Sequence, residues 1–242
     1  MEDHKMKRNA ILIGILLTVI FAVPAAAQNV SIGLTGGLNF ADLNLTAADG
    51  TDRLTSSIIT PAFGVTVDLE LTSYLHLDVE PMYIQKGGIQ MATSQSSPDA
   101  TLKINMLEVP VFIKATLGNK VRPYIKAGPT FGLVVSSNVE TTLEEPGPGQ
   151  SKTYKADLND VLGSFEFGLC AAAGVDFKVG KSRLFVEARY SAGITDVWKG
   201  GSLEWKSGDE VIVVEQSAEG KLNTKGIQVM AGIAFPLGGS KE

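Results

Sequence analysis

Residues 184–191 read LFVEARYS, and their side chains alternate between an apolar set and a set that includes two charges. In an extended strand, successive side chains point to opposite faces. The apolar set would therefore share one face, made by Leu184, Val186, Ala188 and Tyr190. The other face would carry Glu187 and Arg189. The stretch predicts a strand with one apolar face and one charged face.

The same alternation recurs along the chain. It predicts eight strands, at 31–40, 58–70, 74–87, 102–117, 121–136, 162–178, 182–194 and 224–236. The connections alternate in length, with long ones at 41–57, 88–101, 137–161 and 195–223 and tight ones at 71–73, 118–120 and 179–181. Short turns on one side and large loops on the other are typical of transmembrane barrels. We therefore predict an all-β fold, an eight-stranded antiparallel up-and-down transmembrane β-barrel.

The charge on the predicted strands is confined to one face. On the apolar faces, charge is confined to the loop-side ends of strands, as at Lys103. The opposite faces carry Asp68, Asp78, Glu80, Glu108, Lys114, Arg122, Lys126, Glu166, Asp176, Glu187 and Arg189. A Lys or Arg that faces lipid at the bilayer midplane costs about 2–4 kcal/mol. The apolar faces are therefore expected to contact lipid, and the charged faces to line the lumen.

The N-terminus has the pattern of an export signal. Lys5, Lys7 and Arg8 precede an apolar run at 10–23, and the small residues at 25–27 form a cleavage pattern. The apolar run is shorter than the ~20 residues that a spanning helix needs. We predict a cleaved signal peptide at 1–27 and one outer-membrane β-barrel domain at 28–242.

Composition excludes several kinds of function. The net charge of −5 disfavours nucleic acid as a partner. The single cysteine, Cys170, rules out an intrachain disulfide framework and a Cys-rich metal site. The acidic loops lack the spacing of a calcium-binding loop and are expected to be solvated surface. No cofactor and no metal are predicted.

Five segments in order resemble the PorT-type outer-membrane β-barrel proteins, which are often labelled porin-family proteins. They are Gly33–Leu43, Glu80–Gly88, Leu107–Pro110, Tyr124–Pro129 and Glu187–Asp196. The likeness covers nearly all of the chain after the signal. It implies an eight-stranded antiparallel barrel in the outer membrane, in contact with its lipid, and it implies no particular chemistry.

The charges predicted to face the lumen are the first candidate site. We expect a lumen charge network of Asp78, Glu80, Glu108, Lys114, Arg122, Lys126, Glu166, Glu187 and Arg189. Eight strands enclose a space that side chains can fill, and buried charges persist when they are paired. We predict that Arg189 and Lys126 each pair with inner-face glutamates, and that the network fills the lumen. The alternative is a narrow porin-like channel for small solutes or ions.

An enzyme is the second alternative, since a barrel that modifies outer-membrane lipids would need a nucleophile, a base and an orienting carboxylate. The chain has two histidines, His4 and His76, and the first lies in the predicted signal. No serine is placed beside His76 by spacing. We predict that the protein is not an enzyme.

The long connections are the remaining candidate, because binding residues favour loops on rigid scaffolds. Connection 195–223 carries Trp198 and Trp205, which we consider for loop interactions. Segments 201–206 and 210–216 predict a hairpin that turns at 207–209 and extends the last two strands. Its edge could pair with a strand of a protein partner, or the hairpin could be an extension without a ligand. The leading prediction is a non-enzymatic integral outer-membrane protein with a structural or surface-interaction role.

Overall fold

The computed structural model describes residues 30–91, 98–144 and 151–237, so the predicted signal at 1–27 lies outside the described residues. Within these ranges it contains a 14-stranded sheet in which all neighbours are antiparallel. None of the described residues form a helix long and apolar enough to span a membrane. The strands are β1 (Val30–Thr46), β2 (Asp52–Arg53), β3 (Thr55–Ser56), β4 (Ile58–Glu70), β5 (Leu75–Val79), β6 (Met82–Gln90), β7 (Ala100–Thr116), β8 (Val121–Glu144), β9 (Ser151–Asp157), β10 (Phe165–Val179), β11 (Ser182–Gly193), β12 (Gly201–Ser207), β13 (Glu210–Gln216) and β14 (Lys221–Pro236).

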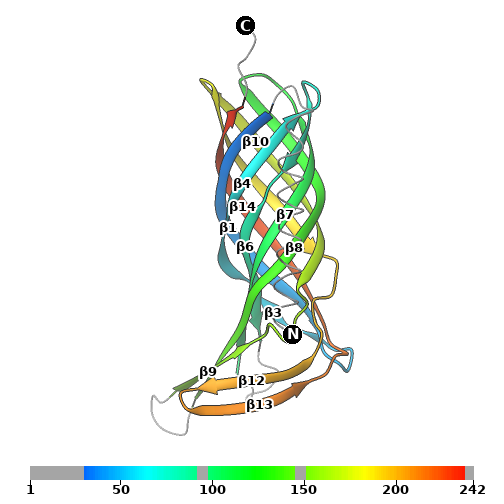
Figure 1. Cartoon of the computed structure of the whole chain (residues 1–242), viewed down its shortest axis with the longest axis vertical. Coiled ribbons are helices and arrows are strands. Elements are labelled where there is room, and N and C mark those ends of the chain that lie inside the picture. Colours follow the sequence, from blue (N-terminus) through cyan, green and yellow to red (C-terminus); the bar gives the residue numbers. More distant parts are fainter. Residues whose placement is uncertain (1–29, 92–97, 145–150, 238–242) are drawn as a thin grey trace.

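The long strands form a closed circuit of pairings. From β1 the neighbours are β4, then β5 and β6, then β7, β8, β10, β11 and β14. β14 pairs with β1 again, from Ser31 opposite Pro236 to Thr46 opposite Lys221. Figure 1 shows this circuit as a cylinder, with the long connections gathered at the lower end. The two ends of the described chain are therefore joined by a full-length ladder.

One predicted strand is interrupted. The sequence predicts a single strand at 74–87, but the ladder breaks between β5 and β6 at Glu80 and Pro81. Proline has no N–H to donate to a neighbour. The break is bridged on both sides, because the Glu80 amide donates to the Pro110 carbonyl and the Val65 amide to the Pro81 carbonyl, each at 3.0 Å. The wall of the cylinder stays continuous across the break.

The loop side contains more strand than the sequence predicts. β1 continues to Thr46, and β8 continues to Glu144, where β9 folds back against it. These residues fall in the predicted connections 41–57 and 137–161. The predicted hairpin is confirmed as β12 and β13, and Gly208, with φ of 60°, begins its two-residue turn. The predicted extension of the last two strands is wrong, because β12 pairs with β9.

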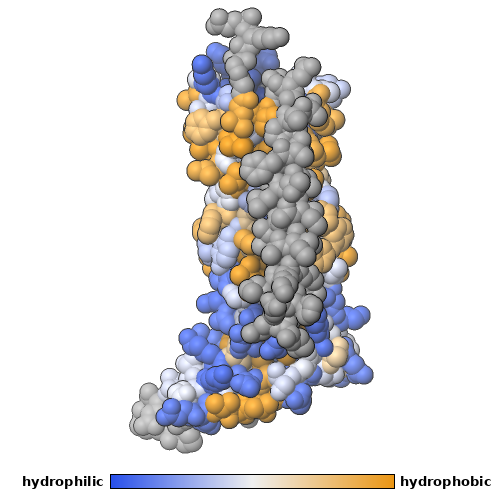
Figure 2. Space-filling view, viewed as in Figure 1, coloured by the Kyte–Doolittle hydropathy of each residue, from blue (hydrophilic) through white to orange (hydrophobic). Residues whose placement is uncertain are grey.

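The two faces of the strands meet different surroundings. Five outward apolar residues are more than half exposed: Leu34, Phe63, Ile125, Val186 and Val229. Figure 2 shows such residues as orange areas on the cylinder. All eleven charged residues predicted to face inward are at most 9% exposed. The cylinder therefore has an apolar outside and a charged inside, the reverse of a water-soluble barrel.

Interior glycines leave the space that the large enclosed side chains occupy. A Cβ at Gly174 would lie 2.6 Å from the Tyr124 Oη, and a Cβ at Gly193 would lie 2.8 Å from the Glu166 Cδ. The interior of a small barrel has little volume to spare. Small residues on one strand are thus paired with long polar ones on the next.

Candidate functional site

The enclosed charges form three clusters at successive depths. The turn-side cluster consists of Asp68, His76, Lys114, Arg122, Asp176 and Arg183. Asp68 Oδ2 lies 2.7 Å from Arg183 Nη2 and 3.4 Å from Lys114 Nζ. Lys114 Nζ also lies 3.2 Å from Asp176 Oδ2. The two carboxylates and the two cations thus alternate around the lumen, which satisfies charges that lipid and water do not reach.

His76 lies in this cluster between Asp68 and Arg122. Its Nδ1 is 2.7 Å from Asp68 Oδ1, and Arg122 Nη2 is 3.1 Å from its Nε2. A guanidinium only donates hydrogen bonds, so we assign Nε2 as the acceptor and place the proton of a neutral ring on Nδ1. Thr116 Oγ1 lies 3.4 Å from Nε2, and Arg122 donates to that oxygen as well, at 2.9 Å. The Thr116 hydroxyl, the His76 imidazole and the Asp68 carboxylate are thus neighbours in this order. Arg122 occupies Nε2, the nitrogen that a general base would use.

The central cluster consists of Asp78, Glu80, Lys126, Glu187 and Arg189. Lys126 donates to Glu80, and its Nζ lies 3.1 Å from Asp78 Oδ2 and 3.0 Å from Glu187 Oε2. Arg189 donates through Nε to Glu187, and its Nη2 lies 2.5 Å from Glu80 Oε2. Both predicted partnerships of Arg189 and Lys126 with glutamates are present. Each cation bridges the same two glutamates, so the five side chains form one unit.

Aromatic side chains complete the central cluster. Tyr124 Oη donates to Glu187 Oε2 at 2.6 Å. The Phe112 ring, which is fully buried, has Lys126 Nζ at 4.6 Å and Arg189 Cζ at 5.7 Å from its centroid. A ring face attracts a cation electrostatically. These rings fill the space beside the charges and leave the cations in contact with protein.

The loop-side cluster consists of Lys86, Glu108 and Glu166. Lys86 Nζ lies 2.5 Å from Glu108 Oε2 and 2.6 Å from Glu166 Oε1. Thr224 Oγ1 donates to Glu166 Oε2 at 2.8 Å. Lys86 therefore pairs with both inward glutamates on the loop side of the lumen.

The predicted network left out Asp68 and Asp176, although both were placed on the inward faces. Two more charged members, Lys86 and Arg183, were not assigned to those faces at all. Both follow from the alternation already used, since Lys86 has the parity of Glu80 and Arg183 has that of Glu187. With them, six cations face seven carboxylates across the three clusters. The described interior is therefore close to electrical neutrality. In each of the three clusters, the excess of one sign is about one charge.

An apolar cap closes the interior on the loop side. It consists of Leu158, Val161, Leu162, Val197 and Leu203, each at most 3% exposed. The cap packs in one cluster with inward residues of the barrel, which include Leu43, Ile104, Met106 and Leu222. Among the described residues, these loop segments thus continue the barrel interior beyond the charged clusters.

Beyond the cap lies a loop-side sheet, formed by the outer part of β8 with β9, β12 and β13. β13 is paired with β12 alone among the described strands, and Val211, Ile212, Val213 and Val214 are each at least 39% exposed. Figure 2 shows the orange area that lies over this hairpin. Edge strands of this kind offer unpaired backbone groups and apolar side chains to a binding partner.

The mouth pocket lies between this sheet and the rim of the barrel, with a volume of about 500 Å³. Both candidate loop residues line it, Trp198 from the last long connection and Trp205 from β12. The indole Nε1 of Trp198 donates to the Ser217 carbonyl at 2.7 Å. The two residues lie in different parts of one predicted connection, and the fold brings both to the same pocket.

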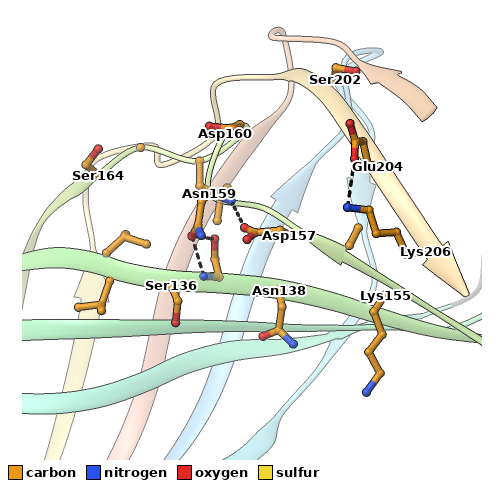
Figure 3. A pocket seen from close by; sticks show the side chains of 16 residues that line it. Ser136, Asn138, Lys155, Asp157, Asn159, Asp160, Ser164, Ser202, Glu204 and Lys206 are labelled. Carbon is orange, nitrogen blue, oxygen red and sulfur yellow. Dashed lines mark hydrogen bonds and ion pairs between the residues drawn. The ribbon is translucent and has the colours of Figure 1, made fainter. Parts of the chain in front are cut away.

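A larger groove of about 1460 Å³ lies beside β8, β9 and β12. Figure 3 shows Glu204 turned to Lys206, with which it forms an ion pair. The Asn159 side chain accepts hydrogen bonds from the backbone and the hydroxyl of Ser137. Lys155 points away from β12 in the same view and pairs with Glu140 at 3.3 Å. These groups do not converge on a shared centre. Across residues 30–91, 98–144 and 151–237 there is also no group of three or more potential metal ligands.

A family model described as outer membrane protein beta-barrel domain matches residues 26–199. The chain belongs to this family. Membership in the outer membrane protein beta-barrel domain family agrees with the apolar outer surface and implies an outer-membrane location. The PorT-type subgroup is a finer assignment than this match provides. No curated protein is significantly similar to the chain in sequence.

Several solved structures resemble this member of the outer membrane protein beta-barrel domain family. The outer membrane protein OprG from Pseudomonas aeruginosa is 10% identical, with 86% of this chain and 96% of that chain covered and a TM-score of 0.48. Neisserial surface protein A is 12% identical, with 85% and 96% covered and a TM-score of 0.38. The outer membrane protease OmpT from Escherichia coli is 9% identical, with 88% and 98% covered and a TM-score of 0.38.

The loop-side sheet is held by an ion pair whose strength should depend on pH. Lys152 of β9 donates to Glu210 of β13, and Tyr154 Oη lies 3.3 Å from the same carboxylate. The hydrogen bond from Lys152 lowers the pKa of Glu210, and the hydrogen bond to Glu210 raises the pKa of Lys152. The contribution of Glu210 is present above the ordinary glutamate pKa of about 4.3 and is lost as pH falls through its lower folded value.

We expect Glu210→Gln to speed amide hydrogen exchange in β13 at pH 7, because the link to β9 is lost. Exchange in the wild type, corrected for the intrinsic effect of pH, should approach that of the variant below about pH 4. Glu215→Gln, on the same strand, is the matched control for loss of one charge. Equal exchange rates in the two variants would show that the ion pair does not hold the sheet.

Proposed function

We propose that this chain is a non-enzymatic outer-membrane barrel of eight strands, filled by its own side chains, whose role is structural or is exercised at its loop-side surface. The count takes β5 and β6 as one interrupted strand beside β1, β4, β7, β8, β10, β11 and β14. The proposal includes a signal peptide at 1–27, a barrel domain at 28–242 and a place among the PorT-type members of the family. Its supports are the export pattern at the N-terminus and the five motifs quoted above.

The observation that carries the proposal is the set of three clusters across the lumen. Every cation in them lies within 4 Å of a carboxylate or donates to a buried acceptor, and almost none of their surface reaches water. A permeating ion would have to break these contacts at three successive depths. Breaking a buried pair costs about 3–5 kcal/mol, so the closed state should dominate.

The surroundings of His76 support the absence of catalysis. A general base needs a free nitrogen within reach of the proton that it removes. Arg122 donates to Nε2 and to the Thr116 hydroxyl at the same time. His76 and Thr116 are 2–3% exposed and Arg122 is 9% exposed, which leaves no room for a lipid substrate. Their arrangement is explained by packing of the turn-side cluster.

The test is ion conductance in a planar lipid bilayer. We expect no current steps above the leak of the bilayer, whereas a narrow channel would give steps of uniform size. A dye on Val213→Cys, at an exposed position of β13, allows inserted molecules to be counted independently. The other thiol, Cys170, is buried and should not react with the dye.

The dye count shows whether protein is present in a bilayer that gives no current. Uniform current steps that coincide with labelled molecules would contradict the filled lumen and would favour the channel. Labelled molecules without current would support the proposal.

A further inference from the structure

We propose that the mouth pocket binds a small amphipathic anion, a carboxylate that carries a single alkyl chain. The inference deepens the proposed role of the loop-side surface in binding and rests on it in that respect. It is independent of whether the lumen conducts ions.

The floor and walls of the pocket are apolar. They include Leu102 of β7, Val139 of β8, Leu158 of the cap and Leu203 of β12, which are each at most 5% exposed. The two indoles lie over this floor, half-buried. Small-molecule sites are typically hollows of about 300–1,000 Å³ with apolar and aromatic linings and a few polar groups. The pocket has the size and lining for an alkyl chain.

The charges that line the pocket are of one sign. Arg53 and Lys221 are both among its lining residues, and no aspartate or glutamate is. Arg53 pairs with Leu45 on β1, and Leu45 also pairs with Leu222, which is fully buried. Directly opposed residues in antiparallel strands share a face, so Arg53 lies on the inward face of the barrel mouth.

The second cation lies on the other side of β1. Lys221 begins β14, pairs with Thr46 and is exposed at the rim. Thr46 follows Leu45 in the strand, so Lys221 starts from the opposite face to Arg53 and borders the pocket at the exposed rim. The carboxylates closest to Arg53 in sequence, Asp49 and Asp52, are exposed and do not line the pocket. A guanidinium matches the geometry of a carboxylate, which completes the complementarity to an anionic head on an apolar chain.

The tryptophans provide a direct readout, because the chain has two and both line the pocket. The protein is placed in nanodiscs of neutral phospholipid and titrated with 11-bromoundecanoate, whose bromine quenches indole fluorescence at short range. We expect saturable quenching. The alcohol of the same length, 11-bromoundecanol, should bind about tenfold more weakly, since it lacks the charge that Arg53 and Lys221 recognise.

The double variant Arg53→Gln/Lys221→Gln should bind the carboxylate about tenfold more weakly. Lys181→Gln, in the tight turn between β10 and β11 at the opposite end of the barrel, should bind like the wild type. Equal, non-saturating quenching by acid and alcohol would mean membrane partition and would overturn the inference. A second outcome would also overturn the inference: a brominated phospholipid quenches the indoles, and added undecanoate does not reverse this quenching. Both comparisons on the wild type stand even if a variant fails to fold.

These results are separate from the conductance test. A silent bilayer with non-saturating quenching would remove the ligand and leave the filled barrel. Uniform current steps with saturable quenching would remove the filled barrel and leave the ligand.

Discussion

Replacing Arg189 with methionine is expected to lower the free energy of unfolding of the barrel by about 3–5 kcal/mol, the cost of removing one partner from a buried ion pair. Arg189 is paired with Glu80 and Glu187, and none of the three is more than 4% exposed. After the substitution, Lys126 would be the remaining cation of the central cluster, against three carboxylates. The measurement is urea unfolding in lipid vesicles, followed by the heat-modifiable migration of the folded barrel on gels.

Two further variants separate charge from packing. Arg189→Met/Glu187→Gln removes one negative charge as well and should recover part of the loss. Lys103→Met makes the same kind of change at a position on the outer face of β7 and should alter stability by less than about 0.5 kcal/mol. If Arg189→Met unfolded at the same urea concentration as the wild type, the central cluster would not be a stabilising unit.

The second large effect concerns the outer surface. Val229→Arg is expected to destabilise the inserted barrel by about 2–4 kcal/mol, because Val229 lies near the middle of the expected lipid-facing band. It is seven residues from Pro236, the turn-side end of β14, or roughly 16 Å of height for a strand tilted by about 45°. The side chain is 54% exposed on the outer wall. The measurement is again urea unfolding in vesicles.

Val213→Arg is the matched control. Val213 lies on β13, beyond the barrel, and is 58% exposed. The same substitution at nearly the same exposure should change the unfolding free energy by less than about 0.5 kcal/mol, because water surrounds it. Equal effects at 213 and 229 would contradict the placement of the membrane around the cylinder.

The alternation of residue types was enough to predict the inside and outside of the barrel. A strict two-residue period assigns each side chain to a face, and the absence of charge on one face identifies the lipid side. The same period also places Lys86 and Arg183 on the inward faces, close to the ends of their strands. It could not foresee the break at Pro81, where a missing N–H ends a ladder while the alternation continues.

The loop side was less predictable. A turn at Gly208 follows from the local sequence, but the pairing of β12 with β9 is set by where β8 carries β9, which no local pattern records. The mouth pocket has the same origin. Trp198, Trp205, Arg53 and Lys221 come from three separate connections or strand ends, and their meeting depends on the closed circuit below them.

The ion pairs of the lumen also have a consequence for how the barrel assembles. They join side chains far apart in the chain, such as Lys86 with Glu166 and Asp68 with Arg183, which are 80 and 115 residues apart. Some pairs lie within one hairpin, such as Arg183 with Asp176, but no hairpin neutralises all of its inward charges. Hairpins inserted one at a time would therefore each carry bare charges into the hydrocarbon, at several kcal/mol per group. Insertion should therefore proceed with the strands already gathered, and β1 and β14, whose ladder closes the wall, should complete the process in a single late step.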